Sequence, residues 1–270
     1  MPKNKNSKKR GGGKTPDGAA VLPLAHPKGG DDDNESVTDK WSTQSVLSND
    51  SSLPGSDSAA NVEDDSEGAT EQENFEDHFS EFLDGLLQKS VKSRVTALQG
   101  IQNALQKKYV AEFLTNRKET LADGVLRCLR KGKGDEQALA ATCLSLVAVQ
   151  LGTEAQSMFT VAQPVLTSVM TDNATHYKAR GACATSLATC CLLCCDDLEK
   201  IKSVTKALED IFGLGYGKGE NSPTVPPELS WLIAQALSAW CLLLTVAPQY
   251  EVQTHINNHL GPLQDLLKKL

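Results

Sequence analysis

Aromatic residues are scarce in this chain of 270 residues, at 5% of the total, which disfavours a fold built on β-sheets. Apolar residues are few at the start: Leu, Ile, Val and Phe make up only 8 of residues 1–74, but 55 of the 196 residues from 75 to 270. The first stretch cannot bury enough apolar surface to offset the entropy of ordering its backbone. We therefore predict a disordered arm over residues 1–74 and a globular domain over residues 75–270.

Charge is unevenly distributed along the sequence. Residues 1–28 carry seven Lys and Arg against one Asp, and residues 31–77 carry fifteen acidic residues against one Lys. The remainder has nineteen basic and eighteen acidic residues. The arm is thus basic over residues 1–28 and acidic over residues 31–77, a pattern that bears on interaction partners rather than on fold.

The start of the chain lacks the apolar segment that a secretory signal peptide requires. We therefore expect an intracellular protein, whose eight cysteines are reduced thiols rather than a disulfide framework. Residues 228–247 are long and apolar enough to span a bilayer, but five polar residues interrupt them and Trp240 would lie near the bilayer centre. We expect no membrane span.

From Phe75 onward the apolar residues follow helical spacing almost throughout, and no stretch alternates with period two. The first stripe consists of Phe75, Phe79, Phe82, Leu83, Leu86 and Leu87. A second helix runs from Val91 to Leu105 behind the capping residue Ser90. The pattern predicts further helices over residues 110–131, 135–151, 154–171, 176–195, 197–213, 227–246 and 249–269. The predicted fold class is all-α.

A pattern of residues spaced i, i+3, i+4 and i+7 recurs along these helices at an interval of 43 residues, with one insertion of ten before the last copy. Small residues in its middle positions let neighbouring helices approach closely. The four copies are Arg94-Ala97-Leu98-Ile101, Gln137-Ala140-Ala141-Leu144, Arg180-Cys183-Ala184-Leu187 and Ile233-Ala236-Leu237-Trp240. This period is typical of HEAT and armadillo repeats, so we predict a HEAT/armadillo-like α-solenoid of about four helical repeats, with a concave face for extended partners.

No motif in the sequence supports catalysis or metal binding. Cysteines at positions 190, 191, 194 and 195 share one predicted helix, where they cannot converge on zinc, so we predict that they pack in the core. His255 and His259 are spaced i, i+4, but Ile256 stands where a zincin motif requires glutamate. The glycine-rich stretches at residues 11–15 and 213–219 fit no phosphate-binding loop. We expect no enzyme activity, no cofactor and no metal.

Two basic clusters remain as candidates for a binding site, one in the arm and one at a helix C-terminus. Each has a simpler interpretation, as a solubilising tail and as a complement to the helix dipole. The candidate RNA- or ribosome-contacting residues are Lys3, Lys5, Lys8, Lys9, Arg10, Lys14, Arg117, Lys118, Arg127, Arg130, Lys131 and Lys133. We expect the last six to form one ridge. Because aromatic residues are missing around this ridge, its contacts would be to RNA backbone and shape.

Several segments resemble the interferon-related developmental regulator family. They are Met1-Pro2-Lys3-Asn4-Lys5, the acidic Ser-rich tether, and residues 91–98, 129–137 and 240–245, while residues 131–141 are nearer to the second family member than to the first. The resemblance implies an armadillo-type helical domain without known enzyme activity. Family members are described as transcriptional co-regulators in differentiation, and the second member also as a repressor that occupies translationally idle ribosomes.

For this chain the resemblance implies a ribosome-binding translational repressor, or alternatively a protein-binding transcriptional co-regulator. The expected partners are ribosomes and rRNA or nuclear regulatory proteins, with no small-molecule substrate, in the cytoplasm and the nucleus. Family members continue well beyond this length, and the last predicted helix is strongly apolar where a solenoid normally ends in a polar capping repeat. We therefore expect the helical domain to be incomplete at its C-terminal end.

Overall fold

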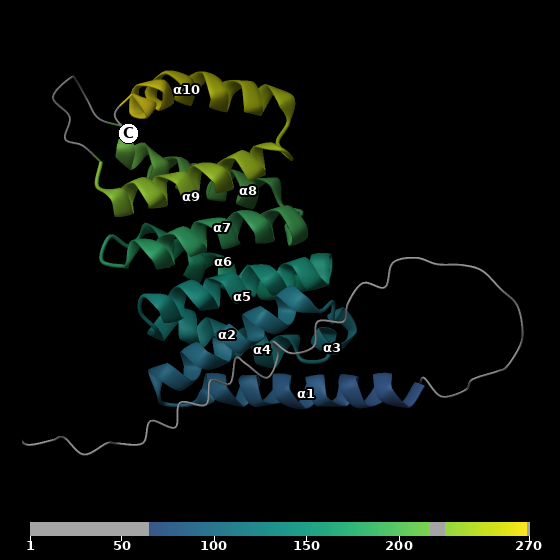
Figure 1. Cartoon of the computed structure of the whole chain (residues 1–270). Coiled ribbons are helices and arrows are strands. Elements are labelled where there is room, and N and C mark those ends of the chain that lie inside the picture. The colour runs from purple at the N-terminus through teal and green to yellow at the C-terminus, as the bar shows by residue number, and fades with distance from the viewer. Residues whose placement is uncertain (1–64, 217–224, 269–270) are drawn as a thin grey trace, which may run out of the picture. The chain divides into compact units, whose positions relative to one another are not determined.

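The computed structural model of the chain describes residues 65–216 and 225–268 (Figure 1). These residues belong to the second of the two units into which the chain divides, residues 53–270. The basic residues predicted in the arm, from Lys3 to Lys14, lie outside the described residues, as does most of the predicted disordered segment. The described ranges consist of helices, short 3-10 turns and loops, with no β-strand.

Ten α-helices follow one another along the described part of the chain. They are α1 (Asp65–Leu87), α2 (Val91–Lys107), α3 (Ala111–Thr115), α4 (Lys118–Lys131), α5 (Asp135–Leu151), α6 (Gln156–Thr171), α7 (Tyr177–Cys194), α8 (Leu198–Phe212), α9 (Pro227–Leu244) and α10 (Gln249–Leu267). Short 3-10 turns precede α6 (η2, Gly152–Ala155) and follow α8 (η3, Gly213–Gly215).

The helices form two layers that follow chain order (Figure 1). In one layer α2, α5, α7 and α9 pack successively against each other, and in the other α4, α6 and α8 do the same. The four copies of the sequence pattern lie on α2, α5, α7 and α9, one copy on each helix of the first layer. The predicted all-α helical-repeat fold is confirmed.

Equivalent side chains in successive repeats make equivalent hydrogen bonds between the helices of the first layer. Cys143 Sγ on α5 donates to Leu98 O on α2 at 3.4 Å, and Ser186 Oγ on α7 donates to Ala141 O on α5 at 2.8 Å. The two donors are 43 residues apart, and so are the two acceptors. Side chains this short reach a neighbouring helix backbone only when the helices are close, as the small residues of the pattern allow.

In three of the four copies, the side chain at the first position of the pattern donates hydrogen bonds to backbone carbonyls at the C-terminal end of the preceding helix. Gln137 Nε2 donates to Leu129 O near the end of α4, and Arg180 Nε donates to Met170 O near the end of α6. Arg94 Nη1 donates to two carbonyls directly after α1. The bonds to Leu129 O and Met170 O satisfy buried carbonyls at helix ends, and the exposed bonds of Arg94 join α2 to the turn after α1.

The prediction of one continuous helix over residues 110–131 is wrong, because two residues separate α3 from α4. Asn116, at the break, competes for backbone hydrogen bonds and is a weak helix former. Phe113 on α3 packs against Phe75 and Phe79 of α1, with ring centroids 5.7 and 5.2 Å apart. Since α4 packs along α5 and α6, a single straight helix does not satisfy both sets of contacts.

The first helix begins at Asp65, so the boundary predicted at residue 75 lies inside α1. Residues 65–74 include Asp65, Glu67, Glu71 and Glu73, and acidic residues near a helix start are stabilised by its dipole. The buried stripe of α1 is also narrower than predicted: Phe75, Phe79 and Leu86 are buried, but Leu87 is 54% exposed.

Two segments of the described residues are long and apolar enough to cross a membrane, judged by length and composition alone. Asp135–Thr171 comprises α5, η2 and α6, and its most apolar window is 56% buried, whereas Pro227–Leu244 is α9 and is 33% buried. These helices pack on α7, and helices inside a protein core pass the same test. The absence of a membrane span stays a prediction.

The predicted core packing of the cysteine run is confirmed for Cys190, Cys191 and Cys194, which are buried, while Cys195 is half-buried. Burial raises the pKa of Cys191 well above its usual range, and it raises the pKa of Cys183 on the same helix to about 12. These thiols are therefore poor nucleophiles, since only the thiolate reacts readily.

We expect iodoacetamide to label Cys241 first and Cys195 second in the native chain, because the other six cysteines are buried. Burial also raises the pKa of Cys241, so its labelling should accelerate between about pH 7 and about pH 9 as the thiolate forms. Peptide mass spectrometry after a short exposure measures the order. Native labelling of Cys143 as fast as Cys241 would contradict the packing, and urea should expose all eight thiols to reaction.

Candidate nucleic-acid interface

Three turns between helices lie along one edge of the repeats: those between α1 and α2, between α4 and α5, and between α6 and α7 (Figure 1, left). Arg127 Nη2 on α4 donates to Leu87 O at the first turn at 3.1 Å. Lys178 Nζ at the start of α7 donates to Asp135 Oδ1 at the start of α5 at 2.7 Å. Contacts between successive repeats therefore hold the three turns side by side.

A buried ion pair fixes the first two turns relative to each other. Arg94 Nε and Nη2 on α2 contact Glu136 Oε1 and Oε2 on α5 at 2.6 and 3.1 Å, a two-pronged geometry that is strong and directional. Only 2% of the Glu136 side chain is exposed. The hydrogen bond to this carboxylate is the main cause that raises the pKa of Arg94.

The turn between α4 and α5 requires two glycines. A Cβ atom on Gly132 would lie 2.7 Å from Glu136 Cδ and 2.4 Å from Cys128 O, closer than side chains approach. Gly134 has φ = +54°, in the left-handed region that other residues rarely adopt. The two glycines therefore set the path of the backbone at Lys133, which lies between them, and directly after Lys131.

Four of the predicted basic residues meet at this turn. Arg130, Lys131 and Lys133 are exposed and make no ion pair with any residue that the structure describes, while Arg127 is half-buried and bonded only to a carbonyl. The two nearest acids are already engaged, because Asp135 pairs with Lys178 and Glu136 with Arg94. The hydrogen bond from Lys178 lowers the pKa of Asp135.

Two further cations at this edge, Lys89 and Lys92, were not among the residues predicted from the sequence. Both are exposed at the start of α2, and neither has an ion pair within the described ranges. Lys89 and Lys92 precede Arg94 by five and two residues, whereas Lys131 and Lys133 precede the equivalent Gln137 by six and four, so the repeat period does not predict them. We call these six residues the basic edge: Lys89, Lys92, Arg127, Arg130, Lys131 and Lys133.

The prediction of one continuous ridge is wrong for Arg117 and Lys118, which lie at the opposite end of α4. A straight helix of this length separates its ends by about 20 Å, so the two groups face different edges. Arg117 is also engaged locally: its guanidinium lies 4.1 Å from the Phe113 ring centroid and 3.9 Å from Glu76 Oε2.

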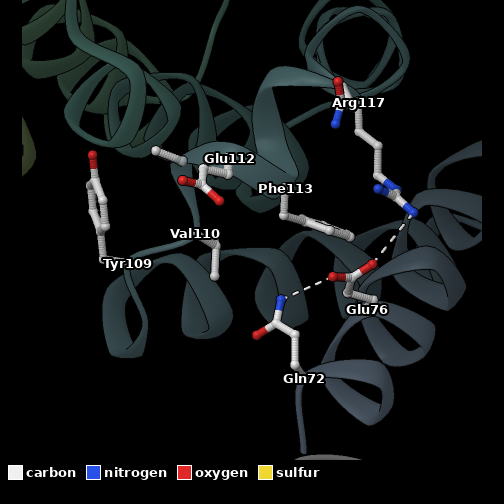
Figure 2. A pocket seen from close by; sticks show the side chains of 9 residues that line it. Gln72, Glu76, Tyr109, Val110, Glu112, Phe113 and Arg117 are labelled. Atoms are coloured by element: carbon white, nitrogen blue, oxygen red, sulfur yellow. Dashed lines mark hydrogen bonds and ion pairs between the residues drawn. The ribbon is translucent and has the colours of Figure 1, made fainter. Parts of the chain in front are cut away.

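An open hollow of about 570 Å³ lies at this opposite edge (Figure 2). Figure 2 shows Glu76 between Gln72, which donates to it at 2.9 Å, and Arg117, with the Phe113 ring beside them. The polar groups around Glu76 thus satisfy one another, while Tyr109 and Glu112 also line the hollow.

The histidines spaced i, i+4 contact a buried carboxylate that the sequence analysis did not associate with them. Glu209 Oε1 on α8 accepts from Trp240 Nε1 at 3.2 Å and lies 2.6 Å from His255 Nδ1 and 3.3 Å from His259 Nε2. Tyr216 Oη lies 3.1 Å from His259 Nδ1. These bonds attach α10 to α8 and α9. Within the described residues, no group of three His, Cys, Asp or Glu is arranged to hold a metal ion.

Sequence comparison relates the chain to proteins of known name. A sequence model described as interferon-related developmental regulator matches residues 40–270. The chain is 38% identical to interferon-related developmental regulator 1 of Sus scrofa over 207 residues, or 75% of this chain and 45% of that protein. It is 37% identical to interferon-related developmental regulator 2 of Mus musculus over 201 residues, or 73% of this chain and 46% of that protein. The chain thus spans less than half the length of the curated relatives it matches.

We expect the substitution Glu136→Gln to lower the free energy of unfolding by about 3 kcal/mol, because it leaves the Arg94 guanidinium without a charged partner in a buried site. Urea unfolding followed by circular dichroism measures the change. Asp135→Asn is the matched control, since the pair of Asp135 with Lys178 is exposed and such pairs contribute little to stability. Equal effects of the two substitutions would show that the buried pair does not hold the turns.

Proposed function

The chain belongs to the interferon-related developmental regulator family, and on this premise we propose that it is a non-enzymatic regulator that binds ribosomes and represses translation. The observation that carries the proposal is the basic edge, where five exposed cations lack a protein partner among the described residues. Ribosomal surfaces are largely RNA phosphate, which attracts such cations and releases counterions on binding.

Helix stabilisation does not account for the whole basic edge. Arg130 and Lys131 lie in the last turn of α4, where the helix dipole favours positive charge. Lys92, however, lies in the first turn of α2, where the dipole disfavours positive charge, and no acidic residue occupies that turn. A surface that tolerates this cost is consistent with selection for binding a polyanion.

The proposal also involves the N-terminal arm, which lies outside the described residues. Lys3, Lys5, Lys8, Lys9, Arg10 and Lys14 form a second basic cluster. In our proposal these residues add sequence-independent phosphate contacts, and the protein works in the cytoplasm and also enters the nucleus. Every residue invoked lies within this chain, so the proposal does not depend on the part of the relatives that the chain does not match.

We expect the triple substitution of Arg130, Lys131 and Lys133 to Glu to weaken ribosome binding strongly and to reduce the slope of log affinity against log salt by about three. Each removed cation eliminates one phosphate contact. The measurement is co-sedimentation of the purified chain with idle ribosomes across a salt series, with in vitro translation measured in parallel.

The control variant carries Lys107→Glu and Lys118→Glu. These two lysines lie at the opposite edge and have no ion pair in the described ranges. This variant should bind nearly as tightly as the unmodified chain. Binding that is insensitive to salt, or equal losses per charge at both edges, would refute the proposal that the basic edge contacts rRNA.

A second candidate function, a protein-binding transcriptional co-regulator, is favoured by the exposed apolar side chains of α10. Leu260 and Leu267 are 52% and 74% exposed, and clustered apolar residues on a surface are typical of protein interfaces. This function predicts nuclear partners that survive ribonuclease and high salt but are lost in the double variant Leu260→Asp, Leu267→Asp. Affinity capture from nuclear extract tests it, and loss of every partner after ribonuclease treatment would exclude it.

A further inference from the structure

A second hollow, of about 480 Å³, lies where the N-terminal ends of α7 and α9 meet. Tyr177 and Trp231 line it together with His176 and Pro227, and Lys178 and Glu228 complete its rim. The Trp231 indole is 42% exposed, although Trp is usually well buried. The hollow therefore presents two large aromatic groups to solvent.

Both rings are held in place by α7. Tyr177 and Gly181 are spaced i, i+4 and share one face of this helix. The indole of Trp231 lies directly on Gly181, where a Cβ atom would come within 2.4 Å of Trp231 Cζ3. Behind Tyr177, the buried Arg180 guanidinium lies 5.8 Å from the ring centroid. The two rings are thus positioned before any ligand binds.

The hollow lies beside the turn between α4 and α5, which carries part of the basic edge. Lys178, at its rim, contacts Asp135, which follows Lys133 by two residues. Packed helices lie about 8–10 Å apart, so a strand passing from α5 across α7 to α9 covers about 20 Å. A segment of about four nucleotides, at the lower end of known single-strand binding sites, spans such a distance.

We infer that Tyr177 and Trp231 stack unpaired bases of an RNA strand whose phosphates lie on the basic edge. The inference rests on the proposed function and narrows its ligand from RNA phosphate in general to single-stranded RNA. Every base has an aromatic face, so stacking of this kind adds affinity without requiring a sequence. The sequence around the second basic cluster lacks aromatic residues. In this inference Tyr177 on α7 and Trp231 on α9 supply them.

Charge favours RNA over the other ligand that such a hollow can take. Grooves lined with Tyr, Trp and Pro also bind proline-rich peptides, which use aromatic faces but need no row of cations. Here Arg130, Lys131 and Lys133 continue the surface without protein partners in the described part of the chain. A polyanion with flat, stackable groups complements both features at once, whereas a peptide complements only the hollow.

The test compares binding of a fluorescent oligouridylate and an RNA duplex, each about twelve nucleotides long, to variants of the full chain. Trp231→Ala and Tyr177→Ala should each weaken oligouridylate binding by about 5- to 150-fold, the effect of losing one stacked base, without changing the salt slope. Duplex binding should not change, because paired bases are already stacked. Tyr109→Ala is the matched control, since Tyr109 is 77% exposed at the opposite edge.

Thermal unfolding of each variant shows whether it folds, and Trp231→Phe, which keeps an aromatic face, should retain most of the binding. Oligouridylate affinities of Trp231→Ala and Tyr177→Ala equal to that of the unmodified chain would overturn the inference. So would binding of a decaproline peptide that Trp231→Ala abolishes while RNA binding persists. In either case the proposed function stands if charge reversal at Arg130, Lys131 and Lys133 still releases ribosomes. If charge reversal has no effect on ribosome binding, the proposed function fails instead.

Discussion

Close packing of the helices α2, α5, α7 and α9 is the constraint on which the rest of the structure depends. The small residues in the middle of each pattern, such as Ala140 and Ala184, are fully buried, so the helix backbones lie near enough for Cys143 and Ser186 to bond the preceding helix. This contact sets both the spacing and the alignment of successive repeats. Because the helices are aligned, their N-terminal ends lie along one edge, together with the turns before α2, α5 and α7.

That alignment brings the basic turns onto one surface, the surface that we propose binds RNA. The turns that carry Lys89 and Lys133 lie side by side because Arg94 reaches Glu136 in the next repeat and Arg127 reaches the carbonyl of Leu87. The glycines at 132 and 134 allow the tight path of the second turn. In our inference the ring of Trp231, which lies on Gly181, is positioned before RNA binds, so less entropy is lost on binding.

The last helix is held differently from the others. Among the described residues of α10 only Leu266 is buried, whereas His255 and His259 both contact the carboxylate of Glu209. Polar contacts to Glu209 and the ion pair of Glu251 with Lys202 at 3.2 Å therefore attach α10, while the earlier repeats also share extensive apolar packing. A helix attached in this way keeps most of its apolar residues exposed, which is the feature that favours the alternative protein-binding function.

The helices, their repeat and the charge of each segment follow from the amino-acid sequence, because helical spacing, small residues at a fixed period and clusters of Lys are local properties. The 43-residue interval, with its ten-residue insertion before the last copy, identified α2, α5, α7 and α9 as equivalent helices. Which cations share an edge depends instead on the packing of the helices, which separates Arg117 from Arg130, places Lys89 and Lys92 at the same edge as Arg130, and brings Trp231 onto Gly181. Those relations join residues that are distant in the chain, and they follow from how helices pack rather than from any spacing that the sequence displays.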